Sequence, residues 1–142
     1  MRDTFLSPPA DQGFGSYLLH AEPDRTLAIF VVSWLPRRGA PPHDHGTWGV
    51  VCGVKGVETN INWLRTDDQS KPGQAELRED GRVSLGRGDI ITVTPKDIHS
   101  VINETDEVTL SFHIYGRHLN ETGRNRFDVE QKRVEPFIIS VR

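Results

Sequence analysis

The chain has 142 residues, 35% hydrophobic and 26% charged, and its 17 basic and 20 acidic residues give a formal net charge of −3. This length predicts one domain, residues 1–142, and this charge gives no field strong enough to recruit nucleic acid. The single cysteine excludes an internal disulfide framework, and neither a signal-peptide pattern nor an apolar stretch of membrane-spanning length is present, so we expect a cytoplasmic protein that does not enter a membrane.

Short runs of β-branched and aromatic residues, separated by glycine and proline, predict strands along most of the chain. Residues 26–34 are a mostly continuous apolar run of strand length. Residues 48–54 and 57–64 flank Lys55-Gly56 and predict a hairpin. Apolar and polar residues alternate in its second arm, so we expect one dry face and one wet face. The dry face is then Val57, Thr59, Ile61 and Trp63, and the wet face is Glu58, Asn60 and Asn62.

The second half of the chain continues this pattern. Residues 66–76 are polar and contain Pro-Gly, which predicts a surface loop, and a short hairpin follows with its turn at Asp80-Gly81. A tight turn leads into a strand over residues 90–94, and residues 108–115 form the last strongly patterned strand.

Beyond residue 116 the polarity rises; residues 120–133 are either loop or a short helix, and residues 137–141 are strand-like. In total, eight to ten short strands with frequent turn signals predict an all-β fold. A jelly-roll barrel, in which two sheets close on each other, is the most economical closure for that many short strands.

Three of the six histidines stand where a metal site is plausible on chemical grounds. His43 and His45 are two residues apart before a predicted strand, so in extended backbone both imidazoles point to the same face. Two neighbouring imidazoles are half of a transition-metal site, whereas the alternative is an exposed polar pair in a proline-rich loop. His99 follows a later strand and has Asn103 four residues after it.

The strand over residues 108–115 carries a second pattern. Ser111, His113 and Tyr115 are spaced two apart and share one face, while Leu110, Phe112 and Ile114 take the other. Inside a narrow barrel, such a line of side chains can form a relay from hydroxyl to imidazole to phenol. The alternative is a polar face toward solvent.

The order HxH, then Pro–x–x–x–His–x–x–x–Asn, resembles the two motifs of the cupin superfamily, whose double-stranded β-helix barrels hold a metal inside. More specifically, PPHDHGTWGVV (41–51), DIHSVIN (97–103) and SFHIYG (111–116) together resemble the thiol dioxygenases, namely cysteine dioxygenase and its bacterial relatives that act on mercaptopropionate. The resemblance covers roughly residues 26–115. It implies one Fe(II) per chain and the oxidation of a small thiol carboxylate by O2 to the sulfinic acid, and it is closer to the bacterial type.

Matching positions imply that His43, His45 and His99 are the iron ligands and that Ser111, His113 and Tyr115 form the outer triad. Many cupins carry a carboxylate four or five residues after HxH, where this chain has Gly49 and Val50. Gly49 also stands where the animal enzymes have a cysteine crosslinked to the triad tyrosine. We therefore expect no such crosslink, and we expect Cys52 to be a small buried apolar residue that points away from the site.

The substrate carboxylate needs a cationic partner. The animal enzymes use an arginine on an early strand, but residues 14–19 contain none. The bacterial enzymes use an arginine shortly after the triad tyrosine, and Arg124 is the best positional match, with Arg126 close behind. The alternative for both is a solvated surface position. The N-terminal helices usual in the family are expected to be largely absent.

Three functions remain open. The first is the iron thiol dioxygenase; the second is a non-catalytic metal- or ligand-binding cupin that acts as a sensor or accessory protein; the third is a metal-dependent cupin enzyme with a non-thiol substrate. Three imidazoles also suit Zn, Ni and Cu, so a purified sample can carry one of these, and the protein is expected to be a monomer or a homodimer. For the remaining candidates, we expect Trp48 and Trp63 to pack in the core, His20 and His118 to lie at the surface, and Asp44 to point away from the metal.

Overall fold

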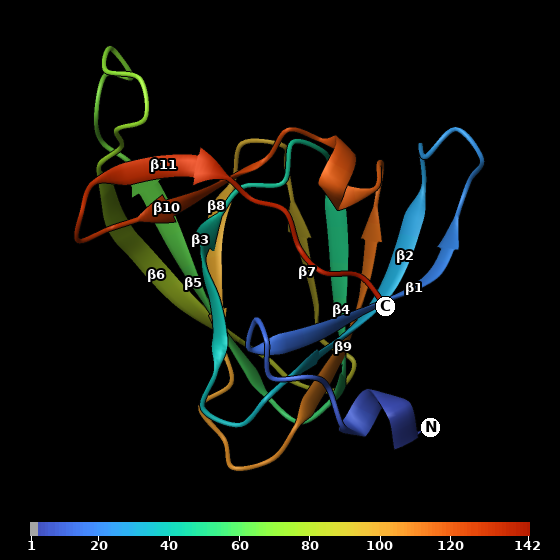
Figure 1. Cartoon of the computed structure of the whole chain (residues 1–142). Helices are drawn as coiled ribbons and strands as arrows, with labels where there is room; N and C mark the ends of the chain where they lie inside the picture. Colours follow the sequence, from blue (N-terminus) through green and yellow to red (C-terminus); the bar gives the residue numbers. More distant parts are fainter. Residues whose placement is uncertain (1–2) are drawn as a thin grey trace.

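The computed structural model describes residues 3–142, and its regular structure is almost entirely β-strand (Figure 1). Within the described range, two short 3-10 helices, η1 (Asp3–Leu6) and η2 (Leu119–Glu121), accompany eleven strands. The strands are β1 (Phe14–Ala21), β2 (Ala28–Trp34), β3 (Gly39–His43), β4 (Gly49–Lys55), β5 (Glu58–Arg65), β6 (Leu77–Leu85), β7 (Ile90–Val93), β8 (Ile98–Ile102), β9 (Thr109–Tyr115), β10 (Asn125–Asp128) and β11 (Arg133–Pro136). No helix in residues 3–142 is long and apolar enough to cross a membrane.

The strands form two antiparallel sheets that face each other (Figure 1). One sheet has the order β1-β2-β9-β4-β7, and the other has the order β11-β10-β3-β8-β5-β6. Neighbours such as β2 and β9 lie far apart in the sequence, so the chain crosses repeatedly from one sheet to the other. This is the arrangement of a jelly roll, and it confirms the predicted all-β barrel.

The apolar run over residues 26–34 becomes β2, which is covered on both of its faces. Phe30, Val32 and Trp34 point into the barrel and belong to its main core. Val31 points outward and packs with Tyr17 under the N-terminal segment. Because a strand with two dry faces needs apolar residues at every position, β2 has no alternating pattern.

The alternation predicted for β5 is present, but its two faces are exchanged at the start of the strand; further along, Asn62 is exposed and Trp63 is partly buried, as predicted. Glu58 and Asn60, expected to face water, are each 2% exposed, whereas Val57 is 45% exposed. The reason is that the barrel interior at this strand holds polar groups, as described below, so the polar face turns inward.

The predicted hairpin at Asp80-Gly81 is also wrong. The segment is one continuous strand, β6, and its pairing with β5 runs from Ile61 opposite Arg82 to Trp63 opposite Glu79. Three steps on β6 therefore match two on β5, which places one extra residue on β6. Gly81 accommodates this bulge with a φ of +98°, a conformation that glycine adopts without strain.

The C-terminal region differs from the prediction as well. Residues 120–133 contain the end of η2 and the strand β10, and β10 pairs with β11. Residues 137–141, expected to be a strand, make only an isolated bridge between Val141 and Ser16. These short edge segments contribute two large aromatic side chains, Phe127 and Phe137, to the core.

Three single-residue expectations are corrected. Trp48 is 50% exposed, because it lies in the loop before β4 and not on the strand itself. His118 is 4% exposed, and its Nδ1 accepts a hydrogen bond from the Asn120 backbone N–H at the start of η2. Cys52 points outward on β4 as expected, but it is only half-buried. Trp63 is partly buried against the small cluster around Phe127, and His20 is exposed.

Asn103, just after β8, ties two distant segments of the barrel together. Its side chain is fully buried, and its Nδ2 donates to the carbonyl oxygens of Trp34 (3.1 Å) and Glu107 (2.6 Å). Its Oδ1 accepts from the backbone N–H of Thr105 (3.0 Å). The amide therefore joins the end of β2 to the loop that leads into β9.

We predict that Asn103→Ala lowers the free energy of unfolding by about 3 kcal/mol, because several buried backbone groups lose their partner. Denaturant unfolding of chelator-treated protein measures this change without a contribution from metal. Asn62→Ala, which truncates an exposed amide, is the control and should change the stability by less than about 0.5 kcal/mol. Equal stabilities of the two variants would contradict this account of Asn103.

Candidate metal centre and hydrogen-bond relay

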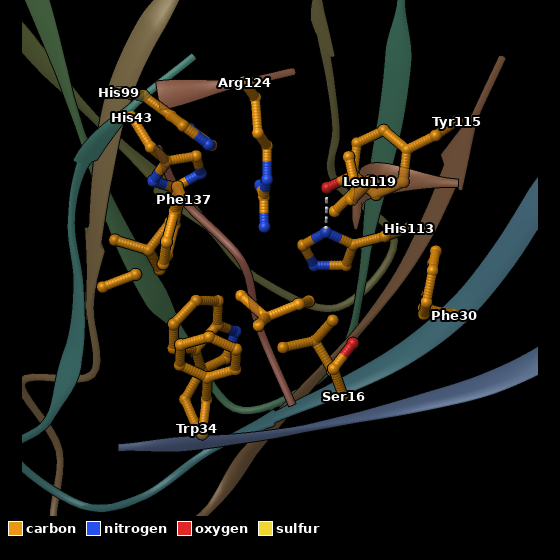
Figure 2. Close-up of a pocket in the computed structure, with 15 residues that line it drawn as sticks. Ser16, Phe30, Trp34, His43, His99, His113, Tyr115, Leu119, Arg124 and Phe137 are labelled. Carbon is orange, nitrogen blue, oxygen red and sulfur yellow. Dashed lines mark hydrogen bonds between the residues drawn. The ribbon is translucent and has the colours of Figure 1, made fainter. Parts of the chain in front are cut away.

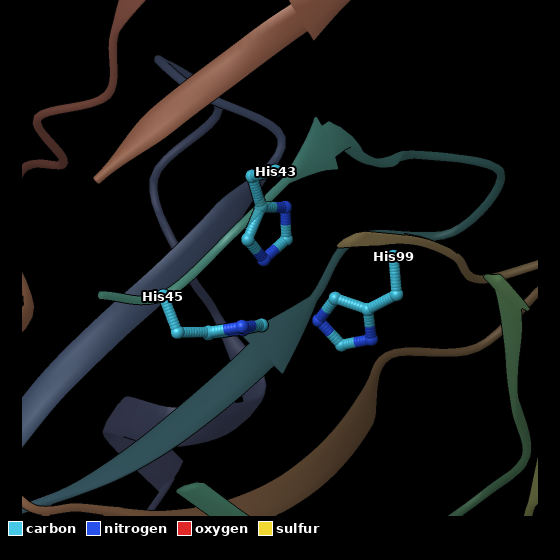
Figure 3. A group of neighbouring side chains, drawn as sticks. All are labelled: His43, His45 and His99. Atoms are coloured by element: carbon cyan, nitrogen blue, oxygen red, sulfur yellow. The ribbon is translucent and has the colours of Figure 1, made fainter. Parts of the chain in front are cut away.

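His43, His45 and His99, the histidine cluster, converge inside the barrel (Figure 3). Each offers a ring nitrogen, and these ligand atoms all lie within 4.8 Å of one another. The ring centroids are 4.7 to 4.9 Å apart, and no ring is more than 5% exposed. The structure thus brings together the three residues that the sequence singled out as ligands.

His43 and His45 do not lie on one extended strand, contrary to what their spacing of two suggests. His43 ends β3 and pairs directly with His99 on β8, whereas His45 lies in the following loop. Gly46, with a φ of +65°, turns the chain immediately afterwards. Asp44 points away, as expected, and its carboxylate accepts a hydrogen bond from the Asn125 backbone N–H (2.8 Å).

Hydrogen bonds fix which nitrogen of two of these rings is free. The Nδ1–H of His43 donates to the carbonyl oxygen of Pro41 (2.8 Å), and the Nδ1–H of His99 donates to the Oδ1 of Asn60 (3.1 Å). Because both acceptors are oxygens that carry no proton, each Nε2 keeps its lone pair. Outer partners of this kind orient the histidines of metal sites.

The unpartnered ring nitrogens of His45 indicate that a metal ion fits here. The His45 ring is fully buried, yet neither nitrogen has a hydrogen-bond partner. Such an orphaned polar group is costly unless a ligand satisfies it. Burial also lowers the pKa of His43 and His45 well below the usual range and that of His99 to about 4, so the three rings are neutral at pH 7 and ready to ligate.

Ser111, His113 and Tyr115, the relay, lie in line on the inward face of β9. The Ser111 hydroxyl is 2.8 Å from His113 Nε2. His113 Nδ1 is 2.7 Å from the Tyr115 hydroxyl (Figure 2). The three side chains are at most 5% exposed, whereas Phe112 on the opposite face is 39% exposed. The predicted shared face is therefore the inner one.

The relay ends beside the histidine cluster. The Tyr115 ring stacks on His45 with centroids 5.7 Å apart. Burial raises the pKa of Tyr115 above its usual value and lowers the pKa of His113 to about 3. At neutral pH the phenol therefore keeps its proton and the imidazole is uncharged.

Tyr115 packs over the bare backbone of Gly49, its partner across the β4–β9 ladder. A Cβ atom at position 49 would lie 2.7 Å from two carbons of the phenol ring. A side chain there would push the phenol out of its place, so the glycine is part of what positions the relay.

Arg124 is the cationic group of this cavity. It follows η2, is 4% exposed, and its guanidinium carbon lies 4.4 Å from the centre of the Phe137 ring. Figure 2 shows the side chain extending between the histidines on one wall and His113 with Tyr115 on the other. Burial lowers its pKa to about 10, so it remains charged at pH 7, and its Nε has no hydrogen-bond partner. A buried cation without a paired carboxylate is suited to bind an anion.

Arg126, the second arginine proposed from the sequence, does not reach the cavity. It is exposed on β10 and forms an ion pair with Glu135, with Nε 2.7 Å from a carboxylate oxygen. Of the two arginines proposed from the sequence, Arg124 therefore lines the cavity and Arg126 does not.

Apart from Ser16, the rest of the cavity is lined mostly by apolar side chains. Its far wall is lined by Phe14, Phe30, Val32, Trp34, Leu119 and Ile139 (Figure 2). These side chains exclude water from the polar end, which strengthens the electrostatic interactions made there.

Sequence reasoning missed three contributors: Asn60, Glu58 and Phe137. Asn60 and Glu58 were assigned to water because they are polar, although polar residues at alternate positions of a strand also fit a polar interior. The run Glu58, Asn60, Asn62 was the signal available. Nothing in the sequence indicated that Phe137 would lie beside both His43 and Arg124.

No family model matches the chain. Among solved structures, an uncharacterized conserved protein with a double-stranded β-helix domain from Klebsiella pneumoniae is 12% identical, with a TM-score of 0.57 over 87% of this chain and 92% of that one. A cupin 2 conserved barrel domain protein from Salinispora arenicola is 15% identical, with a TM-score of 0.53 over 77% and 80%. An oxalate oxidase in complex with the substrate analogue glycolate is 12% identical, with a TM-score of 0.59 over 82% of this chain and 59% of that one.

At these identities the similarity shows the fold, which is the double-stranded β-helix of the cupins. The fold prediction is therefore confirmed. One of the similar structures is an enzyme, but this fold supports many chemistries, so the function has to be argued from the site.

We predict that Asn60→Ala weakens metal binding by the histidine cluster about 10- to 100-fold, because His99 loses the partner that orients it. Titration of the metal-free protein with Zn²⁺ against a competing chelator measures the affinity. Gln131→Ala, which truncates an exposed amide in the loop between β10 and β11, is the control and should bind as the unmodified protein does. If Asn60→Ala binds Zn²⁺ as tightly as the unmodified protein, Asn60 has no role in orienting His99 for the metal.

Proposed function

We propose that this protein is an iron-dependent thiol dioxygenase that oxidises a small thiol carboxylate with O2 to the sulfinic acid. The observation that carries the proposal is the combination, in and around one cavity, of a carboxylate-free histidine cluster, the relay and the unpaired Arg124. The motifs of the chain that resemble thiol dioxygenases support the same assignment.

The ligand set suits an anionic sulfur substrate. Three neutral imidazoles leave the full double charge of a divalent ion, and they leave part of its coordination sphere open. Bound there, iron would convert a coordinating thiol to its thiolate and provide the site at which O2 reacts. His43 and His99 would use Nε2, because their Nδ1 protons are already committed to Pro41 and Asn60.

Arg124 would fix the other end of the substrate. Its guanidinium is charged, buried and free of any carboxylate partner in the described part of the chain, and it lies in the same cavity as the histidines. A guanidinium binds a carboxylate through two parallel hydrogen bonds. A substrate held at both its sulfur and its carboxylate has one orientation, which lowers the entropic cost of reaction.

Tyr115 would act as a hydrogen-bond donor toward the reacting end of the substrate. Its raised pKa excludes a role as a base at neutral pH. His113 and Ser111 hold the phenol in place through hydrogen bonds of 2.7 and 2.8 Å. In the net reaction RSH + O2 → RSO2H, both oxygen atoms are added to sulfur, which loses four electrons as O2 gains four.

The decisive experiment is oxygen uptake by iron-loaded protein on addition of 3-mercaptopropionate or cysteine, with mass spectrometry of the product. We expect about one O2 consumed per sulfinic acid formed. Protein loaded with Zn²⁺ is the control and should consume none. If iron binds but no small thiol is consumed, the proposal is wrong, and a ligand-binding cupin or an enzyme for a non-thiol substrate takes its place.

A second prediction separates the two arginines. Arg124→Gln should lower kcat/KM for the thiol carboxylate about 100-fold, since it loses a buried charge-assisted pair of hydrogen bonds. Arg126→Gln removes the same charge two residues away at the exposed position and should leave kcat/KM unchanged. A thiol without a carboxylate should be oxidised equally by all three proteins. Equal loss of activity in both variants would argue against a carboxylate-binding role for Arg124.

A further inference from the structure

Glu58 is a buried carboxyl group that the proposed reaction does not use. It begins β5, it is 2% exposed, and its Oε1 has no hydrogen-bond partner. Removing a carboxylate from water without an ion pair is expensive. A surface strand position would accept glutamate at no cost, so its place inside the barrel needs a reason.

The groups around Glu58 connect it to the relay. The hydroxyls of Ser111 and Thr109 on β9 favour the charged form of its carboxyl and so lower its pKa, and the Thr109 hydroxyl has no hydrogen-bond partner. The turn that precedes β5 packs directly on Thr109, since a Cβ atom at Gly56 would lie 2.7 Å from the Thr109 methyl group. Glu58 therefore lies at the Ser111 end of the relay, opposite the Tyr115 end.

The inward face of β5 thus serves both halves of the site. Asn60 accepts a hydrogen bond from His99 of the histidine cluster, and Glu58, two residues earlier on the same face, faces Ser111 of the relay. The exchange of faces at the start of β5 is what brings both side chains into the barrel.

Burial raises the pKa of Glu58 to about 7, and the Ser111 and Thr109 hydroxyls oppose the rise. No charged side chain in the described residues contributes to this shift. The titratable groups on the same side are His113 and Tyr115 further along β9, and the Glu58 carboxylate in turn raises the pKa of Tyr115. The carboxyl therefore gains or loses its proton near neutral pH, while His113 and Tyr115 stay neutral.

We propose that Glu58 is the fourth member of the relay, a positioning residue whose proton sets the direction of the hydrogen bonds between Ser111 and Tyr115. The effect on the relay is argued from the burial of Glu58 and its place beside the start of β9, whereas its effect on turnover rests on the proposed function.

The two directions follow from counting protons. When Glu58 is protonated, it donates to Ser111, Ser111 donates to His113 Nε2, and His113 Nδ1–H donates to Tyr115. The phenol proton is then free to point into the cavity. When Glu58 is ionised, Ser111 donates to the carboxylate, His113 Nε2–H donates to Ser111, and the phenol donates to His113 Nδ1. Toward the cavity, the phenol oxygen can then only accept a hydrogen bond.

The test is the tautomer of His113, observed by ¹⁵N NMR of the Zn²⁺-loaded protein between pH 5.5 and 8.5. We expect the ring proton to move from Nδ1 to Nε2 with a midpoint near pH 7. In Glu58→Gln the carboxamide N–H donates to Ser111 at every pH, so the Nδ1–H tautomer should persist throughout. Glu130→Gln, which changes an exposed carboxyl, should titrate as the unmodified protein does. A tautomer that does not change with pH, or one that still changes in Glu58→Gln, would overturn the proposal.

Turnover provides a second measurement. The kcat of the iron-loaded protein should fall about tenfold from pH 6 to pH 8 as Glu58 ionises, and Glu58→Gln should remove this alkaline loss. Because the folded-state pKa of Glu58 lies above its usual value of 4.5, the stability falls as the pH rises from about 4.5 to about 7 and is lowest above that range, so Glu58→Gln should have the higher Tm at pH 8 and a similar Tm at pH 5. If no thiol is oxidised, the proposed function fails, while the NMR titration still decides the role of Glu58.

Discussion

The burial of three uncharged imidazoles at one point is the constraint on which the rest of the molecule depends. Two of these rings are satisfied there because their Nδ1–H groups donate to the oxygens of Pro41 and Asn60, whereas both nitrogens of His45 lack a partner and are free to bind a ligand. Strands from both sheets have to close around that point, since water would otherwise compete for every ligand position. The two sheets therefore exclude water from a polar group of side chains in the interior of the barrel.

Opposite walls of the barrel have different tasks. The wall of β3, β8 and β5 supplies His43, His99 and the amide that orients His99, whereas β9 in the other sheet supplies the relay. Tyr115 bridges the two by stacking on His45 across the interior. Arg124 comes from neither wall; it enters from the loop after η2, where Phe137 supports its charged group. A ligand in the cavity would thus be contacted from three independent parts of the chain.

The buried charges explain how one small cavity can hold groups of different character. Desolvation favours the uncharged form of each histidine and of Tyr115, and it shifts the carboxyl of Glu58 toward its neutral form. Arg124 alone keeps its charge, because its ordinary pKa is so high that burial cannot neutralise it at pH 7. The interior therefore carries a net positive charge even before a metal ion binds, which favours an anionic ligand.

Much of this site was visible in the sequence, because local spacing decides which side chains share a face. The intervals of two between Ser111, His113 and Tyr115 were enough to predict their common face, and the motif order was enough to predict the double-stranded β-helix. Spacing does not decide which side chains enter the barrel: the first residues of β5 have the predicted alternation with its faces exchanged, and Arg124 in the loop before β10 is buried whereas Arg126 on β10 is exposed. That choice belongs to the tertiary structure, because only the closure of two sheets around the histidines makes a polar residue more stable inside the barrel than in water.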